Sequence, residues 1–216
     1  GADVLANLLT NTNDTFITSA GDDILSGGAG QDTLTGGLDA DRFVDTVANL
    51  HQDTITDLST EDVIEVTGVR FSAIRYNGST GVLELDTSGN GSFATRVNLP
   101  SGLNGEFLAT PSAAGEAAFT QVRLMPDSDG DGVGDFRDNA ILLPNPDQRD
   151  TDGDGYGNVV DADFNQDNIV DFFDLSMFDS VFFTSDADAD LNGDGQVDFF
   201  DLSILDDLFG KPPGPS

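Results

Sequence analysis

The stretch TNTNDTFIT SAGDDILSG GAGQDTLTG GLDADRFVD (residues 10–45) is built from four consecutive segments of nine residues. Each segment has an aspartate at the same place and a large apolar residue two positions later. A short fixed period predicts a solenoid in which each repeat supplies one tight turn and one very short strand. Glycine permits the positive φ angles of the turn and lets the backbone approach an ion. The pattern predicts a parallel β-roll with ion-caging aspartates and inward-facing apolar residues: Asp14, Asp23, Asp32 and Asp41; Phe16, Leu25, Leu34 and Phe43.

The stretch GGAGQDTL (residues 27–34) resembles the RTX, or hemolysin-type, calcium-binding repeat. The resemblance covers about residues 1–66 and implies Ca²⁺ ions that are shared between stacked coils. DTITDL (residues 53–58) and EDVI (residues 61–64) resemble the last, irregular coils of such a roll, which adds Asp53 and Asp62 to the expected ligands. Four copies in phase argue against the alternative of a glycine-rich linker.

The composition points to a protein that needs cations. Acidic residues outnumber basic ones by 40 to 8, and the formal net charge is −32. Without a basic patch, the chain is not expected to bind nucleic acid or an anionic membrane surface. There is no cysteine, so divalent cations must supply the cross-links that disulfides supply elsewhere. No apolar run reaches the length of a membrane span, so we expect no direct membrane insertion.

Residues 67–125 carry little charge and alternate between apolar and polar residues, as in VLELD (residues 82–86) and FATRVNL (residues 93–99). Such alternation between Asn-Gly and Ser-Gly turns predicts strands. The segment is similar to those that flank RTX rolls, and we expect a capping β-structure over the open end of the roll.

Four further stretches share the ligand spacing of an EF-hand loop, in which oxygens at positions 1, 3, 5, 9 and 12 surround a hard cation. Each has glycine or asparagine at position 6, where the chain must bend sharply: Gly132, Gly155, Asn168 and Gly195. The expected ligands are Asp127, Asp129, Asp131, Asp135 and Asp138; Asp150, Asp152, Asp154, Asn158 and Asp161; Asp163, Asn165, Asp167, Asp171 and Asp174; and Asp190, Asn192, Asp194, Asp198 and Asp201. We call these stretches loops 1 to 4. Four nearly complete ligand sets argue against a merely solvated acidic surface.

Loops 1 and 2 lack helical flanks and lie in PDSDGDGVGDFRDNAILLPNPDQRDTDGDGYGNVVD (residues 126–161). This segment resembles thrombospondin type-3 repeats, which wrap irregular backbone around calcium ions. The resemblance implies a calcium-held linker over residues 126–160.

Loops 3 and 4 are each followed by a stretch with helical spacing, DFFDLSMFDSVF (residues 171–182) and DFFDLSILDDLF (residues 198–209). The duplicated loop and helix over residues 161–216 resemble a dockerin, which implies a cohesin-like receptor as partner. In that family positions 10 and 11 of each loop contact the partner, and here they are Phe172, Phe173, Phe199 and Phe200. Two interpretations stay open: one phenylalanine of each pair packs in the core, or it is presented to a partner.

The predicted fold class is mostly β plus a small α module: an RTX-like roll (1–66), a β cap (67–125), the linker (126–160) and the paired helices (161–216). We expect no enzyme, because His51 has no partner pattern and the paired carboxylates are assigned to cations. Six to nine Ca²⁺ ions are expected, by about one ion per loop plus shared roll sites. The chain is expected to be a secreted or cell-surface protein of a bacterium: a segment of a fibre, adhesin or matrix that assembles head to tail, or alternatively the anchoring tail of a larger secreted enzyme or adhesin.

Overall fold

The computed structural model of the chain describes residues 1–6 and 11–214. It divides into two compact units, Gly1–Pro126 and Asp127–Ser216. The first unit consists of two six-stranded sheets and the second carries the two longer helices. The predicted fold class, mostly β with a small α module, is confirmed. Thr10, the first residue of the first nonapeptide, lies outside the described residues.

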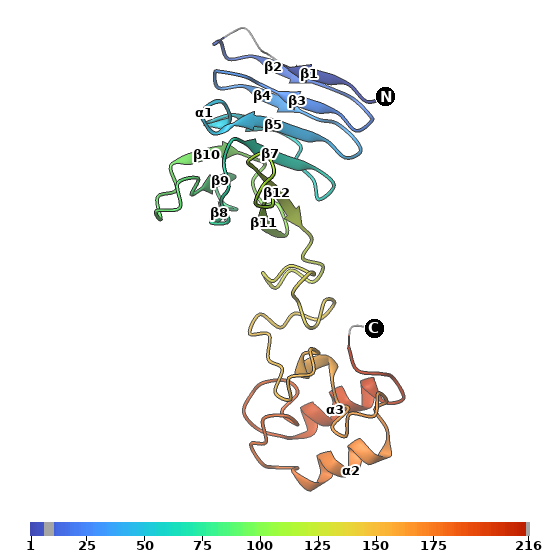
Figure 1. Cartoon of the computed structure of the whole chain (residues 1–216). Helices are drawn as coiled ribbons and strands as arrows, with labels where there is room; N and C mark the ends of the chain where they lie inside the picture. The colour runs from blue at the N-terminus through green and yellow to red at the C-terminus, as the bar shows by residue number, and fades with distance from the viewer. Residues whose placement is uncertain (7–10, 215–216) are drawn as a thin grey trace. The chain divides into compact units, whose positions relative to one another are not determined.

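The stacked coils of the first unit alternate between its two sheets (Figure 1). The first sheet has the order β1 (Val4–Ala6), β3 (Ile24–Ser26), β5 (Arg42–Thr46), β7 (Val63–Thr67), β12 (Phe119–Met125) and β11 (Glu106–Pro111). The second has the order β2 (Thr15–Ile17), β4 (Thr33–Thr35), β6 (Thr54–Ile55), β10 (Thr95–Asn98), β9 (Val82–Leu85) and β8 (Ile74–Asn77). Within the roll, neighbouring strands of each sheet are parallel.

The apolar residue of each nonapeptide forms the interior of the roll. In the parallel pairs, Leu25 lies beside Phe43 and Phe16 lies beside Leu34. Leu25, Leu34 and Phe43 are buried, whereas their neighbours in the three-residue strands are partly exposed. A strand of three residues therefore suffices, because only its central side chain has to point inward.

The cap continues both sheets of the roll. Strand β12 pairs antiparallel with β7, and β10 pairs parallel with β6 through Asn98 and Thr54. One apolar core joins roll residues such as Phe43 to cap residues such as Leu85. The predicted boundary at residue 66 falls inside β7, because this strand pairs with the roll on one side and with the cap on the other. A short helix, α1 (Val47–Leu50), begins after Thr46, whose side chain accepts the N–H of Asn49.

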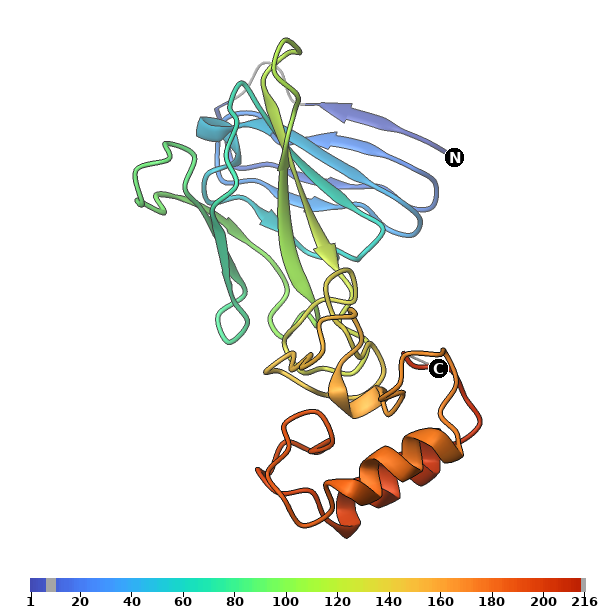
Figure 2. The same cartoon turned by 60° about the horizontal axis from the view of Figure 1, so that its bottom comes forward.

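The second unit has little regular structure before its helices. One 3₁₀ turn, η1 (Asn158–Val160), precedes α2 (Phe172–Ser180) and α3 (Phe199–Leu208), which lie side by side (Figures 1 and 2). Both helices begin at an aspartate of a predicted loop, Asp171 or Asp198, in a capping box completed by Asp174 or Asp201. A small core, Ala162, Val170, Phe178, Ala189, Leu191, Val197, Leu205 and Leu208, lies beneath them. None of the helices in the described part of the chain is long and apolar enough to span a membrane.

Candidate calcium sites

The aspartates of the roll form a ladder along each edge. In each ladder the backbone N–H of one aspartate donates to Oδ1 of the aspartate in the next coil. Hydrogen bonds of 2.8–2.9 Å join Asp14 to Asp32, Asp32 to Asp53, Asp23 to Asp41, and Asp41 to Asp62. The structure thus brings together the six predicted roll residues as two stacked series, Asp14, Asp32 and Asp53 on one edge and Asp23, Asp41 and Asp62 on the other.

The second carboxylate oxygen of four of these residues has no partner in the protein. Oδ2 of Asp23, Asp32, Asp41 and Asp53 is buried without a hydrogen bond, and the side chains are at most 1 % exposed. An unpaired buried carboxylate oxygen is strongly unfavourable, because it has lost water and gained nothing in return. Hard cations that take oxygen ligands, Ca²⁺ above all, fit these positions.

The glycines of the turns leave the space that such an ion needs. A Cβ atom at Gly27 would collide with Oδ2 of Asp32, and one at Gly36 would collide with Oδ2 of Asp41. Neither glycine has a positive φ. The absence of a side chain is therefore what matters at these two positions, because it keeps the region around the unpartnered oxygens open.

The electrostatics of the ladders also favour a bound positive charge. Burial and, to a lesser extent, the negative charges of Asp32 and Asp45 together raise the pKa of Asp53 to about 7. Burial likewise raises the pKa of Asp41 to about 6, with contributions from Asp62 and Asp23. Without a cation, the folded ladders hold protons near neutral pH that ordinary carboxyl groups release.

Two carboxylates that the sequence analysis missed complete the last coils. Asp45 accepts from the hydroxyl of Ser26 (2.9 Å) and from the N–H of Gly28 (3.0 Å). Asp57 accepts from the N–H groups of Gly36 and Gly37. Each lies 17 to 21 residues after the turn that it contacts. That offset of one coil was the signal in the sequence that could have identified them.

The four predicted loops share one internal hydrogen-bond pattern. In each, Oδ2 of the first aspartate accepts from the N–H of position 6, at 3.0 Å (Asp127), 3.1 Å (Asp150), 2.6 Å (Asp163) and 3.0 Å (Asp190). In each, Oδ1 of position 5 accepts from the N–H of position 7, in Asp131, Asp154, Asp167 and Asp194. Position 6 has a positive φ throughout, including 70° at Asn168, as predicted. Equal spacing in the sequence has thus produced equal local structure.

In loops 1 and 2 the carboxylates converge. One ligand oxygen each of Asp127, Asp129 and Asp131 lies within 4.8 Å of the others, and the same holds for Asp150, Asp152 and Asp154. At position 12 of loop 1, Asp138 has a buried Oδ2 without a partner, as does Asp129.

The twelfth residue of loop 2 also faces its cluster. Burial raises the pKa of Asp161 to about 7, and the charges of Asp154 and Asp152 add to the rise. Burial raises the pKa of Asp188 as well, with Asp152 as the largest charged contributor. Asp188 lies outside every predicted loop, and its approach to loop 2 could not be read from the ligand spacing.

In loops 3 and 4 the twelfth residue closes the loop. Asp174 and Asp201 are fully buried. Oδ1 of each accepts from the N–H of position 3, Asn165 at 3.2 Å and Asn192 at 3.0 Å. Because position 3 is an asparagine here, three converging carboxylates are found only in loops 1 and 2 among the described residues.

Position 9 has a role that the ligand spacing did not predict. In loop 1, Asp135 accepts from both the N–H and the hydroxyl of Ser128, at 2.7 Å each. In loop 2, Oδ1 of Asn158 accepts from the N–H of Thr151 at 2.9 Å. In loops 3 and 4 the same position, Asp171 and Asp198, caps a helix. The side chain at position 9 therefore stabilises the conformation of each loop through these hydrogen bonds, independently of any oxygen that it contributes to an ion.

The paired phenylalanines lie on the surface. Phe172, Phe173, Phe199 and Phe200 are 67–75 % exposed. The interpretation that one of each pair packs in the core is therefore wrong, because the buried apolar residues of the two helices lie further along the chain and include Phe178 and Leu205. The rings of Phe172 and Phe199 lie edge-on to Phe209 and Phe182, each at 5.1 Å.

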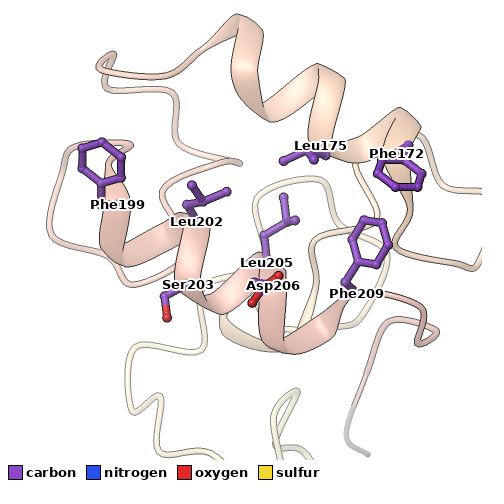
Figure 3. Close-up of a pocket in the computed structure, with 8 residues that line it drawn as sticks. All are labelled: Phe172, Leu175, Phe199, Leu202, Ser203, Leu205, Asp206 and Phe209. Atoms are coloured by element: carbon purple, nitrogen blue, oxygen red, sulfur yellow. The ribbon is translucent and has the colours of Figure 1, made fainter.

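An apolar groove of about 550 Å³ lies between α2 and α3. Figure 3 shows its lining, with Phe172 and Leu175 from one helix facing Phe199, Leu202, Leu205 and Phe209 from the other, and with Ser203 and Asp206 at its edge. The structure thus joins two of the four predicted partner-binding residues, Phe172 and Phe199, in one concave surface. Phe173 and Phe200 do not line it.

Comparison with known families supports the roll. Residues 10–43 match the family model of the RTX calcium-binding nonapeptide repeat, in four copies. The chain thus carries RTX calcium-binding repeats over the residues that include Asp23, Asp32 and Asp41, three of the aspartates with an unpartnered oxygen. A comparison with curated proteins found no match.

Proposed function

We propose that the chain is a non-catalytic, secreted calcium-binding protein that serves as a calcium-rigidified segment or subunit of an extracellular fibre, adhesin or matrix. The observation that carries this proposal is the set of four buried, unpartnered Oδ2 atoms of Asp23, Asp32, Asp41 and Asp53 between stacked coils. The RTX match, which covers Asp23, Asp32 and Asp41, supports Ca²⁺ as the ion.

The geometry supports the binding of several ions. Among the described residues the two aspartate ladders contain five gaps between bonded coils, because the N–H of Asp3 also donates to Oδ1 of Asp23. One ion in each gap and one in each of the four loops would give about nine, the upper end of the six to nine expected from the sequence. These ions would cancel about half of the net charge of −32.

A location outside the cell agrees with the proposed dependence of folding on calcium. Extracellular calcium modules bind with dissociation constants of about 10⁻⁴–10⁻³ M, far above cytosolic calcium concentrations. Because binding free energy at such sites is folding free energy, the chain would remain largely unfolded during export and fold outside the cell.

Circular dichroism and a calorimetric calcium titration test the proposal. We expect a folded spectrum in millimolar calcium and a largely unfolded one in EDTA, with about six to nine ions bound per chain. A folded spectrum in excess chelator would falsify the calcium-dependent fold.

The groove between α2 and α3 favours a second candidate function, that of a dockerin-like anchoring tail. Four exposed phenylalanines and a concave apolar surface are typical of an interaction site. In this case a cohesin-like receptor takes the place of a second copy of the chain. Negative-stain images in millimolar calcium discriminate the two candidates: head-to-tail polymers support the first, and monodisperse particles support the second.

A non-catalytic role agrees with the use of the titratable groups. His51 accepts the backbone N–H of Arg96 through Nδ1 at 3.2 Å. The buried aspartates are engaged with backbone N–H groups within the ladders and loops. Ionisable groups with these roles hold the backbone in place.

A further inference from the structure

Loops 2 and 4 are joined by side chains that no ligand spacing requires. Arg149 immediately precedes Asp150, the first ligand of loop 2, and reaches Asp190, the first ligand of loop 4. Its NH1 donates to Oδ2 of Asp190 at 3.0 Å, and its NH2 donates to the carbonyl oxygen of the same residue. Both side chains are mostly removed from solvent, at 27 % and 6 % exposure. The contact is therefore more than a solvated surface ion pair.

A second set of bonds joins loop 2 to the segment that enters loop 4. The hydroxyl of Thr151 donates to the carbonyl of Ala187 at 3.2 Å, and Nδ2 of Asn158 donates to the same carbonyl at 2.9 Å. The other end of the Asn158 side chain accepts from the N–H of Thr151 and closes loop 2. We call Arg149, Thr151 and Asn158 the clasp. One side chain of the clasp thus both shapes loop 2 and contacts the approach to loop 4.

We propose that the clasp makes loops 2 and 4 a coupled pair, so that a cation bound at one loop raises the affinity of the other. The inference rests on the proposed calcium function of these loops. Closing loop 2 positions Thr151 and Asn158 to hold the carbonyl of Ala187. Arg149 meanwhile holds Asp190 in the conformation in which its Oδ2 accepts the N–H of Gly195. Coupling of this kind is reciprocal, so order at loop 4 also favours the closed loop 2.

A luminescence titration with Tb³⁺, a hard trivalent cation that takes oxygen ligands, can follow loop 4 alone when the excitation wavelength is one that an indole absorbs and a phenol does not. This choice excludes sensitisation by Tyr156, which occupies position 7 of loop 2. The chain has no tryptophan, so Gln196→Trp places a single indole at position 7 of loop 4, next to the ion. Asp154→Asn weakens loop 2, and Asp131→Asn makes the same change at position 5 of loop 1, outside the clasp. Both are made in the Gln196→Trp protein and in the same protein with the clasp removed by Arg149→Gln and Thr151→Val.

With the clasp present, Asp154→Asn is expected to lower the affinity of loop 4 for Tb³⁺ by about fivefold or more, the lower end of measured site coupling. Without the clasp the effect should fall below about twofold. Asp131→Asn should stay below about twofold in both proteins. Asp154→Asn removes the same charge in both backgrounds, so its long-range electrostatic effect cancels in the comparison.

An equal effect of Asp154→Asn with and without the clasp overturns the coupling. The absence of Tb³⁺ and Ca²⁺ binding at loop 4 in the parent would instead contradict the proposed function, so the two failures are distinguishable. If the protein without the clasp does not fold in calcium, Thr151→Val alone takes its place. It should then weaken the coupling, and an unchanged coupling overturns the inference.

Discussion

At the scale of single residues, the roll depends on glycines that leave room beside a carboxylate. Gly36 has no positive φ, and its Cβ would collide with Oδ2 of Asp41. Gly36→Ala should therefore block the ion gap next to Asp41 without straining the backbone. The expected loss is about 3 kcal/mol at calcium concentrations a hundredfold above the dissociation constant, measured as a lower Tm in calcium together with one ion fewer in calorimetry.

Gly78→Ala is the matched control for this change. Gly78 also has no positive φ, and its Cβ would meet only the ring of Tyr76 at 3.7 Å, an ordinary contact. Its Tm and ion count should stay close to those of the parent. Equal ion counts in the two variants would contradict the assignment of the gap.

The raised pKa values of Asp41 and Asp53 predict how the calcium-free protein responds to pH. Ordinary aspartates titrate near pH 4, whereas these two titrate at about 6 and about 7 in the fold. Between about pH 4 and these raised pKa values, the two carboxyl groups hold protons in the folded state that they have released in the unfolded chain. Stability is therefore present at low pH and lost as the pH rises through about 6 to 7.

Without calcium, the small fraction of folded protein, measured by circular dichroism, should be larger at about pH 5 than at about pH 7.5. Asp53→Asn, which cannot titrate, should reduce this difference, whereas Glu61→Gln at an exposed position should leave it unchanged. At a fixed calcium concentration the dependence should reverse, because protons compete with the ion for the same oxygens. A calcium-free folded fraction that rises with pH in this window would contradict the assignment of Asp41 and Asp53.

At the scale of elements, α2 separates its core residues from its exposed ones within two turns. Phe178 is 1 % exposed and lies 5.6 Å from the ring of Phe182, whereas Phe173 is 70 % exposed. Phe178→Ala should cost about 3–5 kcal/mol of unfolding free energy, and Phe173→Ala should change it by less than about 0.5 kcal/mol. Urea unfolding in saturating calcium measures both. Similar losses in the two variants would mean that Phe173 packs in a core after all.

The first turn of each helix is stabilised by residues of the loop before it. The first turn of α2 is held by Asp171 and Asp174, and that of α3 by Asp198 and Asp201, all of them predicted ligands. Each capping residue therefore belongs to a loop and a helix at once.

At the scale of the whole molecule, the density of negative charge predicts that folding depends on bound cations. Between residues 127 and 207 lie 23 aspartates and no glutamate, with two arginines as the only basic residues. Like charges at this density oppose compaction until a counter-ion is bound. Calcium should therefore shrink the hydrodynamic radius, whereas the same ionic strength in sodium chloride should not. Small-angle scattering with calcium, with chelator and with sodium chloride measures this, and compaction by sodium chloride alone would contradict specific cages.

The sequence by itself determined the coils of the roll and the internal shape of the loops. Nine residues specify one turn and one inward side chain, and twelve residues specify the hydrogen bonds from positions 6 and 7 to the aspartates at positions 1 and 5, so both follow from local spacing. The bend at Asn168 and the buried positions of Leu25 and Phe43 were predictable for this reason.

Only the tertiary structure decided how these local units combine. Strand β12 pairs with β7, and Arg149 contacts Asp190, although these residues lie far apart in the chain. The exposure of the paired phenylalanines likewise depends on the fold as a whole. Such contacts depend on which surfaces are buried together, and no short spacing encodes that choice. The ladders show both levels at once: the repeat places each aspartate, and the stacking of coils leaves its second oxygen buried and without a partner.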